Sequence, residues 1–402
     1  RSHVVKLYPK PSQIVKLKQF SGAVRALYNI ALWQRETQYR KKSINFASQS
    51  REVTDLRKEF VWFKDVPRSC LTYSLKNLDN AFKDFFNKSK GYPKYKKKGV
   101  NDSFTFQIDT RTPISGTPRR YNKNGGYIQL PKIGDVKFRG WKNIDGNLLS
   151  CTVKEVNGNW YASIAYEKEI KDPLVNNKNP VGMDLGITNF AYMSNGDIYV
   201  KPKTDKSLIN LLKRRQRKLA RKKKGSNKRK KLIKQIAKIH KKIADVRKDF
   251  LHKTSDQLTK NHGIIVMEKL NIKNMTKSAK GTVSKPGKNV KQKSGLNRSI
   301  LDQGWYMFYT FLKYKSEVNG GKIILVDPKY TSQTCPSCGH IDSNSRKSQS
   351  HFDCTACGFS DHADRNGAVN IINRAARSGS LPVEAVSAMA REAGTMLNDC
   401  VN

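Results

Sequence analysis

The clearest chemical pattern in the sequence is a set of four cysteines arranged as two matched pairs. Cys335 and Cys338 form one C-x-x-C pair, and Cys354 and Cys357 form a second pair after 15 intervening residues. A glycine follows each pair and permits a tight backbone turn. The spacing predicts one structural zinc ion held by four thiolates, with no coordination position left open for catalysis. Four free cysteines are the alternative. The other cysteines lack such partners and are predicted to be small hydrophobic residues: Cys70, Cys151 and Cys400.

Three acidic residues occupy positions that suit metal chemistry. Asp184 lies in the apolar run VGMDLGI, where an unpaired carboxylate is costly. Glu268 ends a second apolar run, IIVMEKL, and Asp364 stands at the start of a predicted helix, DRNGAVNIINRA. RNase H-like folds gather carboxylates from such places around two divalent metal ions, which align a water molecule and stabilise the pentacovalent phosphorus.

Each acid also has an ordinary structural alternative. Asp184 fits a strand end, Glu268 a surface acid and Asp364 a helix N-cap. Taken together they are harder to explain in this way, because the chain is poor in acids. Spacing alone does not decide which residue is the third acid beside Asp184 and Glu268. The main rival of Asp364 is Asp361, and weaker rivals are Asp302 and Asp327.

The composition demands a polyanionic partner. The chain has 78 Lys and Arg against 32 Asp and Glu, a formal net charge of +46, and such a surface repels itself unless it binds an anion such as nucleic acid. We find no apolar run approaching the length of a membrane span and no signal segment at the start. The paired cysteines favour a reducing compartment over a disulfide framework. The sequence therefore predicts a soluble, cytoplasmic protein.

The amino-terminal half alternates between strand and helix patterns. Residues 4–8 predict a strand, and helical periodicity follows from Ser12 and again from Leu71, until GYPKYKKKG at 91–99 interrupts it. From about 101 to 171 the period is two, with an Asn157-Gly158 hairpin signal between alternating runs. We expect the first strand to pair with this later sheet, which would make the helical region an insertion.

The carboxyl-terminal half predicts a second hairpin over 181–200, with its turn at Asn195-Gly196. Residues 201–250 hold 22 Lys and Arg against 3 acids, and their apolar stripe predicts an antiparallel basic helical hairpin. Strands are predicted at 263–270 and 322–328. Between them, residues 273–298 hold 8 cations and no acid, which indicates a mobile basic loop, followed by a helix through Leu301, Trp305, Phe308 and Leu312.

Several of these motifs resemble one known family. DLGI at 184–187, MEKL at 267–270, YTSQTCPSCG at 330–339 and CGFSDHADRNGAVNI at 357–371 resemble the TnpB (OrfB-type) proteins of insertion sequences, relatives of the type V CRISPR effectors. VVKLYPKPSQ, SLKNLDNAFKDFF and GYPKYKKKG resemble the family's opening segments, so the likeness covers nearly the whole chain. Many members have Ala where Gly367 stands, a departure that costs helix propensity and leaves the acid in place.

The resemblance implies an α+β multidomain fold. Its parts would be a β-barrel wedge domain, an inserted helical recognition domain, and an RNase H-like (RuvC) α/β nuclease domain interrupted by a four-cysteine zinc ribbon. The implied bounds are 1–10 and 100–175 for the wedge domain, 11–99 for the recognition domain, 176–330 and 361–402 for the nuclease domain with its basic hairpin at 205–250, and 331–360 for the zinc ribbon.

The function implied is that of an RNA-guided DNA endonuclease, a metal-dependent enzyme that hydrolyses phosphodiester bonds. Such a protein binds a guide RNA from its own transposon end, recognises a short motif beside the target and cuts double-stranded DNA. By motif, Asp184, Glu268 and Asp364 would be catalytic and hold two Mg²⁺ ions, and the four cysteines would hold one Zn²⁺. The protein would be a monomer within a ribonucleoprotein, acting at the prokaryotic nucleoid.

The resemblance also implies nucleic-acid contacts. The helix around Thr72 and the β module near Gln107 would lie by the target-adjacent duplex, and the basic hairpin would lie along the heteroduplex. Exposed tyrosines among lysines could stack on bases, whereas core packing is the better expectation for Phe104 and Phe106. The candidate contact residues are Thr72, Tyr73, Lys76, Tyr92, Lys94, Tyr95, Gln107, Arg214, Arg215 and Arg221.

Three alternative functions remain open on the sequence. A nuclease-inactive RNA-guided DNA-binding protein would leave the intact set of acids without a role. A transposase that joins the strands of its element's ends is compatible with the carboxylates, but the sequence shows no Tyr-His-x-His type of nucleophile arrangement. A zinc-ribbon RNA-binding protein would leave the acids unexplained.

Overall fold

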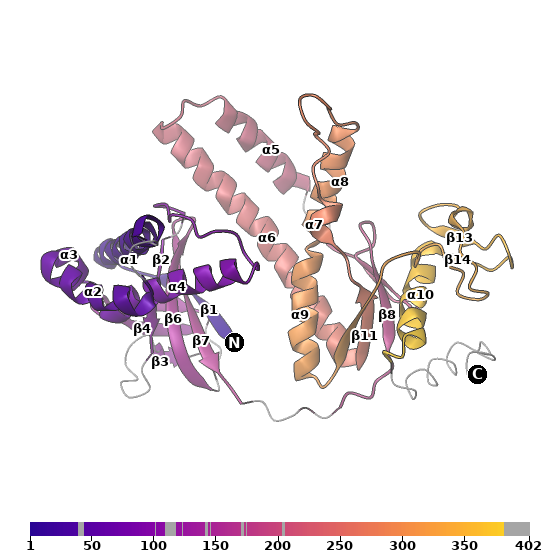
Figure 1. The fold of residues 1–402 in the computed structure, drawn as a ribbon, viewed down its shortest axis with the longest axis horizontal. Helices are drawn as coiled ribbons and strands as arrows, with labels where there is room; N and C mark the ends of the chain where they lie inside the picture. The colour runs from indigo at the N-terminus through magenta and orange to yellow at the C-terminus, as the bar shows by residue number, and fades with distance from the viewer. Residues whose placement is uncertain are drawn as a thin grey trace. The chain divides into compact units, whose positions relative to one another are not determined.

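A computed structural model describes residues 1–38, 44–100, 102–108, 118–122, 124–140, 144, 146–169, 173, 175–202 and 206–381. The chain divides into two compact units, Arg1–Glu169 and Ile170–Asn402, which are drawn in indigo to magenta and in magenta to yellow in Figure 1. Within the described residues, no helix is both long enough and apolar enough to cross a membrane.

In its described residues, the first unit combines four helices with one antiparallel sheet. Strand β1 (Ser2–Tyr8) pairs with β7 on one side and β5 on the other, so the helices are inserted between β1 and β2, as predicted. The hydrogen-bonded order of the seven strands is β2-β6-β7-β1-β5-β4-β3. The remaining elements of this unit are α1 (Pro11–Gln38), α2 (Phe46–Glu59), α3 (Val61–Lys64), α4 (Arg68–Phe86), β2 (Ser103–Gln107), β3 (Pro118–Asn122), β4 (Gly125–Leu130), β5 (Gly134–Arg139), β6 (Asn147–Val156) and β7 (Asn159–Glu167).

The predicted hairpin between β6 and β7 is confirmed. Its two turn residues, Asn157 and Gly158, have φ angles of 54° and 80°, the left-handed conformation that a two-residue hairpin turn requires. Asparagine and glycine adopt this conformation at low cost. Local chemistry alone is therefore sufficient to place this turn.

The helices and the sheet of the first unit share one hydrophobic core. The Phe20 ring of α1 meets the Phe104 ring of β2 at 5.6 Å, and Phe104 meets Phe106 at 5.3 Å, both edge to face. The expectation that Phe104 and Phe106 pack in the core is confirmed. Cys70 and Cys151 are also fully buried in this core, as predicted, and burial raises the pKa of both thiols. Cys400 lies outside the described residues.

The second unit is built on a five-stranded sheet. Its strands are β8 (Val181–Leu185), β9 (Ala191–Met193), β10 (Ile198–Tyr199), β11 (Ile264–Glu268) and β12 (Lys322–Val326). They are ordered β10-β9-β8-β11-β12; β8, β11 and β12 run parallel, whereas β9 is antiparallel to β8. The turn at Asn195-Gly196 joins β9 to β10, so the predicted turn is confirmed but the region contains a three-stranded meander.

Helices cover both faces of this sheet (Figure 1). On one face, Met183 and Met267 pack in a core with α6 (Asn227–Asn261) and α9 (Trp305–Val318). On the other face, Val266 packs against α10 (Ala363–Arg377). Strands that are covered on both sides read as continuous apolar runs, which explains why an acid in such a strand is conspicuous.

The basic segment forms the predicted antiparallel hairpin of two helices. Helix α5 (Lys206–Ala220) is followed by α6, whose N-cap Ser226 accepts from the Arg229 amide. Arg229 Nη1 reaches back to the carbonyl oxygens of Leu219 and Lys222, at 2.7 and 3.2 Å. We call α5 and α6 the basic hairpin. Its second helix extends eleven residues beyond the predicted end at 250, to Asn261.

Two predictions for the segment after β11 are wrong. Residues predicted as a loop include the short helix α7 (Ile272–Met275) and most of α8 (Val290–Gln303). Gly304, with φ of 76°, then separates α8 from α9, so the single helix predicted through Leu301 and Leu312 is two helices. The buried Ile300 provides α8 with an apolar anchor that the high lysine content of the segment obscures.

The four-cysteine segment lies between β12 and α10. It contains a short 3₁₀ turn (Ser343–Ser345) and a two-stranded ribbon of β13 (His351–Asp353) and β14 (Ser360–His362). Strand β14 runs without a break into α10, which begins at Ala363. The ribbon therefore sets the position at which α10 starts.

Candidate active site and metal centre

Two of the predicted acids lie side by side at the ends of parallel strands. Met183 of β8 is in register with Met267 of β11, so the next residues, Asp184 and Glu268, are neighbours at the carboxyl ends of these strands. Residues in register on parallel strands point to the same face. Since Gly182 and Val266 face α10, alternation directs Asp184 and Glu268 toward α10 as well.

Glycines allow α10 to approach the sheet closely at this point. A Cβ atom on Gly182 would collide with the Ala368 carbonyl oxygen of α10. A Cβ atom on Gly367 would lie 3.1 Å from Asp184 Oδ2. The Asp184 carboxylate therefore lies against the first turns of α10, the helix that carries Asp364.

Asp364 occupies the first turn of α10, beside a histidine cap. His362 Nδ1 accepts from the Asp364 amide at 3.2 Å, and its ring stacks on Tyr192 of β9 with centroids 4.9 Å apart. The rival Asp361 is engaged locally, since it accepts from the His362 amide at 2.7 Å and pairs with Arg365 Nη1 at 3.5 Å. The helix start thus presents Asp364 to the other two acids.

The three acids, which we call the acidic group, interact electrostatically. Burial raises the pKa of Asp184 to about 7, and the charges of Glu268 and Asp364 contribute in the same direction, whereas Arg346 opposes them. Burial also raises the pKa of Glu268. All three residues are half-buried. A cluster of partly desolvated carboxylates disfavours its own ionised form, and a bound cation reverses that preference.

Two residues of the four-cysteine segment reach the acidic group. Thr331 Oγ1 donates to Glu268 Oε1 at 2.5 Å, and Arg346 Nη2 lies 3.5 Å from Asp364 Oδ1. The Thr331 hydroxyl opposes the rise in the pKa of Glu268. Neither residue was predicted from the sequence, because nothing local marks them as neighbours of the acids.

Two buried asparagines attach α10 to the segment that leads to the first cysteine. Asn370 Nδ2 donates to the carbonyl oxygens of Thr331 and Thr334, at 2.9 and 2.6 Å. Asn366 Nδ2 donates to Thr334 O at 3.2 Å. These asparagines stand four apart on one helix face that is otherwise apolar. Buried amides need partners, so their spacing is the sequence signal that could have located this contact.

The weaker rivals of the third acid are held in other interactions. Asp302 accepts from Lys201 Nζ at 2.5 Å and from Arg247 of α6, and these bonds hold the end of α8 in place. Asp327 accepts from the Lys329 amide at 3.1 Å, although its charge helps to raise the pKa of Glu268. Among these candidates, only Asp364 contributes with Glu268 to the raised pKa of Asp184.

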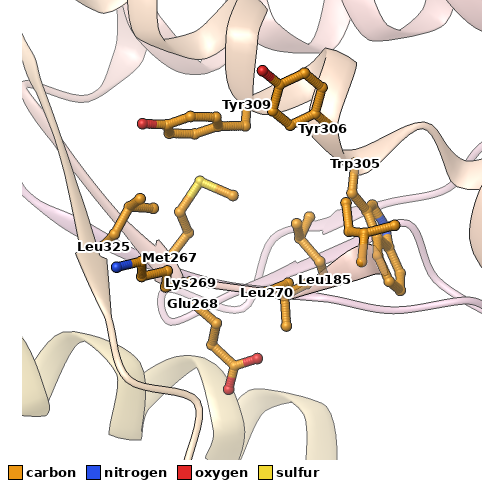
Figure 2. Close-up of a pocket in the computed structure, with 10 residues that line it drawn as sticks. Leu185, Met267, Glu268, Lys269, Leu270, Trp305, Tyr306, Tyr309 and Leu325 are labelled. Carbon is orange, nitrogen blue, oxygen red and sulfur yellow. The ribbon is translucent and has the colours of Figure 1, made fainter. Parts of the chain in front are cut away.

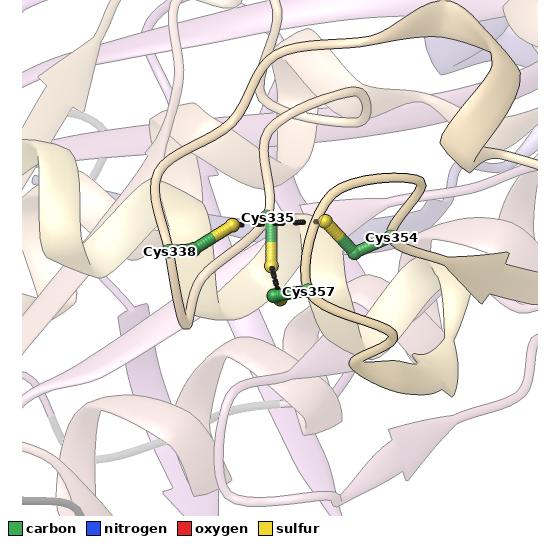
Figure 3. A group of neighbouring side chains, drawn as sticks. All are labelled: Cys335, Cys338, Cys354 and Cys357. Atoms are coloured by element: carbon green, nitrogen blue, oxygen red, sulfur yellow. Dashed lines mark hydrogen bonds between the residues drawn. The ribbon is translucent and has the colours of Figure 1, made fainter.

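The four cysteines converge on one point, as Figure 3 shows. The Cys335 and Cys357 sulfur atoms are 3.7 Å apart, those of Cys338 and Cys354 are 3.6 Å apart, and all four lie within 4.8 Å of one another. Both turns have the same hydrogen bonds, from Gly339 N to Cys335 O at 3.0 Å and from Gly358 N to Cys354 O at 3.1 Å. Both glycines are left-handed, with φ of 76° and 72°.

These sulfur positions fit a tetrahedral metal ion. With a zinc to sulfur distance of about 2.3 Å, the edge of a regular tetrahedron is about 3.8 Å, close to the two measured separations. The acidic group is arranged more loosely. Among the described residues, only the cysteines bring three or more ligand atoms of His, Cys, Asp or Glu within 4.8 Å of one another. Carboxylates that share two ions about 4 Å apart need not converge on a point.

The candidate nucleic-acid contacts are spread over both units. In the first unit, Lys76 Nζ lies 5.8 Å from the Tyr73 ring centre, Tyr92 packs edge to face on Phe82, and Tyr95 bonds to Glu36. Both Tyr92 and Tyr95 keep more than two fifths of their surface exposed. Exposed candidates are Lys76, Lys94, Gln107, Arg214 and Arg221, and half-buried ones are Thr72, Tyr73 and Arg215.

Three family models match the chain. One described as "Probable transposase", of the OrfB type, matches residues 163–279, and one described as "Cas12f1-like, TNB domain" matches residues 305–371. A third, described as a helix-turn-helix domain, matches residues 1–43. In the described part of that range, β1 is followed by the single long helix α1.

Curated relatives match over most of the chain. "Putative RNA-guided DNA endonuclease InsQ" of Escherichia coli K12 is 38% identical, over 91% of this chain and 90% of the relative. A "Putative RNA-guided DNA endonuclease" of Streptomyces pristinaespiralis is 28% identical, over 92% of this chain and 88% of the relative.

A chain in the cryo-EM structure of a Cas12f1–sgRNA–target DNA complex aligns with a TM-score of 0.56 and 17% identity, over 90% of this chain and 82% of that chain. That similarity shows a shared α+β fold, and the match to InsQ shows the family: this chain belongs to the OrfB-type (TnpB) family.

Proposed function

We propose that this chain is an RNA-guided DNA endonuclease that cuts DNA at the acidic group with two divalent metal ions. The observation that carries the proposal is the grouping of the half-buried Asp184 with Glu268 and Asp364, in a chain whose net charge is +46. Three mutually repelling carboxylates are stabilised in their charged form by cations of high charge density. The named activity of the relatives supplies the substrate class.

The chain's own residues hold the proposed metal ligands in place. We take the ions to be Mg²⁺, because it prefers carboxylate oxygens and leaves sites for water and phosphate. Bound there, two such ions activate the attacking water and stabilise charge on the phosphorus. Strand register aligns Asp184 with Glu268, Thr331 orients the Glu268 carboxylate, and the first turn of α10 positions Asp364. The strand order β10-β9-β8-β11-β12 supports an RNase H-like nuclease domain. So does the packing of α10, which carries Asp364, against β8, which carries Asp184.

Arg346 is a candidate for binding the substrate phosphate. Its side chain is 29% exposed and lies 3.5 Å from Asp364 Oδ1, so it is both close to the acidic group and accessible to solvent. A guanidinium group binds two phosphate oxygens at once through parallel hydrogen bonds. With the acids holding cations, Arg346 would no longer be needed as a partner of Asp364 and would be available to the scissile phosphate.

The four cysteines are the proposed ligands of one structural Zn²⁺. The ion would fold residues 331–360 as a zinc ribbon and thereby hold Thr331 and Arg346 beside the acids. All four ligands are thiolates, which matches closed structural zinc sites. Zinc is thus proposed to support catalysis through the geometry of the chain and to make no contact with the substrate.

The proposed domains cover the whole chain. The sheet with β1 would be the wedge domain (1–10 and 100–175), and α1 to α4 the recognition domain (11–99). Residues 176–330 and 361–402 would form the nuclease domain. The partners would be a guide RNA and double-stranded target DNA, bound by a monomeric protein. The cations of the basic hairpin support these partners, and the ten candidate contact residues are proposed to touch them.

The test begins with the RNA that copurifies with the full-length protein. We expect one abundant RNA with a constant scaffold and a variable end, and Mg²⁺-dependent cutting of DNA that matches the variable end. Asp184→Ala should lower the cutting rate by about three orders of magnitude. Asp249→Ala, on the exposed surface of α6, is the matched control and should cut like the parent.

Three outcomes would change the assignment. If Asp184→Ala cuts as fast as the parent, the acidic group is not the catalytic centre. If the parent binds matching DNA in Mg²⁺ without cutting it, the chain is an RNA-guided binding protein, and recovery of joined strands from transposon ends would indicate a transposase.

A further inference from the structure

A pocket lies beside Glu268, between the end of the sheet and helix α9 (Figure 2). Its volume is about 180 Å³. Its lining is mostly apolar and aromatic: Leu185, Met267, Leu325, Trp305, Tyr306 and Tyr309 contribute, with Lys269 at the strand end. We call it the base pocket.

The base pocket and the acidic group share strand β11 but lie on opposite faces of it. Figure 2 shows the Glu268 carboxylate directed toward α10, while Met267 and the tyrosines of α9 lie on the other side of the strand. Strand alternation explains this, because Met267 and Glu268 are consecutive residues of β11. The strand ends at Glu268 and the chain continues through Lys269 and Leu270, which also line the pocket, so the pocket and the acids lie at the same end of the sheet.

The pocket keeps aromatic surface in contact with solvent. Tyr306 is 74% exposed and Leu325 is 38% exposed, although both line a concave apolar site. Trp305 is only 5% exposed, and its indole Nε1 has no acceptor among the described residues. The exposed ring of Tyr306 beside a hollow indicates a ligand that stacks.

We infer that the base pocket takes one unpaired nucleobase of the strand whose phosphate lies at the acidic group; this inference rests on the proposed nuclease function. A cavity of about 150 Å³ is large enough to bind benzene, so the pocket has room for a base that enters through its open side. Stacking on aromatic side chains is the usual way in which proteins hold unpaired bases. The exposed Lys269 at the rim suits the phosphate backbone.

Binding one base next to the acids would fix the scissile phosphate. A phosphodiester strand is flexible when single-stranded, and immobilising the neighbouring base limits the positions that the phosphate can take. The pocket would also require a strand to be unpaired before cutting, because a base inside a duplex cannot enter it. It is therefore a positioning site for the substrate, distinct from the metal ligands.

The first experiment removes one base at a time from the DNA. The ribonucleoprotein, purified with its own RNA, is given matching targets that carry a single abasic nucleotide at successive positions around the cut. We expect cutting by the parent to slow by about tenfold at one position, since a stacked base is worth roughly 1–3 kcal/mol. Tyr306→Ala and Tyr309→Leu should slow the cutting of normal DNA by a similar factor and lose the sensitivity to that abasic position.

Tyr314→Ala is the matched control. Tyr314 is a partly exposed tyrosine on the same helix, outside the pocket lining, so this variant should keep the abasic effect. A flat abasic series for the parent would overturn the inference, as would an unchanged abasic effect in Tyr306→Ala. Tyr306 is largely exposed, so its truncation leaves the core intact, and a melting curve verifies that the variant is folded.

A second experiment does not depend on cutting. A single strand containing 2-aminopurine is mixed with full-length Asp184→Asn protein, and the fluorescence is followed as the fluorescent base stacks. We expect quenching at one position, which Tyr306→Ala and Tyr309→Leu relieve and Tyr314→Ala does not. Quenching that is independent of the tyrosines contradicts the base pocket. If the parent never cuts DNA but this quenching is found, the nuclease proposal fails and the base pocket stands.

Discussion

The two polar centres of the second unit are built in opposite ways. The four cysteines lie within 23 consecutive residues, and each pair forms its own hydrogen-bonded turn, so their sulfur atoms converge with little help from the rest of the fold. The acidic group spans 181 residues and comes from two strands and a helix. A compact motif carries its own geometry, whereas a dispersed one depends on sheet register and helix packing.

The two centres are nonetheless joined by a short stretch of chain. Thr331 and Arg346 come from the four-cysteine segment and contact Glu268 and Asp364, and β14 of the ribbon continues directly into α10. The four-cysteine site therefore supports the acidic group. We expect a change at the cysteines to affect both sites, and a change at the acids to affect the acidic group alone.

The largest expected effect comes from removing a cysteine, which tests whether the acidic group depends on the four-cysteine site. Cys338→Ser should reduce bound zinc from one ion per chain to nearly none, because a structural site of this kind contributes about 10–16 kcal/mol of metal binding that needs all four ligands. It should also slow DNA cutting, since Thr331 and Arg346 lose their support. Metal analysis of the purified protein and the cutting rate provide the two measurements.

Cys70→Ala is the control for that experiment. Cys70 is a buried thiol of the first unit, so its removal should lower the melting temperature and leave the zinc content at one ion per chain. Full retention of zinc by Cys338→Ser would show that the cysteines are not a metal site.

The next effect concerns the identity of the third acid. Asp364→Asn should lower the cutting rate by about three orders of magnitude, while its zinc content stays unchanged. Asp361→Asn should cut within a few-fold of the parent, because Asp361 is engaged with Arg365 and the His362 amide. The reverse order of the two variants would assign the third position to Asp361.

A smaller effect tests how closely α10 must approach the sheet. Gly182→Ala should destabilise the protein by about 1–3 kcal/mol and slow cutting, because the new methyl group collides with the Ala368 carbonyl oxygen. Gly367→Ala has more room, with its Cβ 3.1 Å from Asp184 Oδ2, and gains about 0.5–1 kcal/mol of helix propensity. Thermal unfolding and cutting rates of the pair measure the difference, and equal losses would refute the close packing at Gly182.

The smallest effect is a pH dependence of the acidic group. The pKa of Asp184 is raised to about 7 from an ordinary value of 3.8, so without metal its contribution to stability falls as the pH rises from about 4 to about 7. A proton and Mg²⁺ then compete for the same carboxylate. We expect the half-saturating Mg²⁺ concentration for cutting to rise by about tenfold per pH unit below 7 and to level off above about 8.

The matched measurement for this prediction is zinc content over the same pH range. It should stay constant from pH 6 to pH 8, since the closed cysteine site binds far more tightly than the open acidic one. A Mg²⁺ requirement that does not change between pH 6 and pH 8 would argue against a raised pKa at Asp184.

Local patterns predicted those elements whose cause is local. The Asn157-Gly158 turn needs two left-handed residues, the basic hairpin shows its apolar stripe in the sequence, and the apolar runs around Asp184 and Glu268 reveal strands covered on both sides. The segment before α9 was predicted less well. Its many lysines indicate a loop, but α8 is held by the buried Ile300 and by the bonds of Asp302 to Lys201 and Arg247, which are contacts with distant residues.

The residue types and their spacing were enough to predict a metal site at the four cysteines and to name the three acids, since paired cysteines are typical of metal sites and an acid in an apolar strand is costly unless it binds a partner. The folded chain was needed to show which acids meet, that Thr331 and Arg346 join them, and that an aromatic pocket opens on the other face of β11. These relations depend on the register of β8 with β11 and on the approach of α10. Register and packing arise from contacts between residues far apart in the chain, which short-range patterns do not encode.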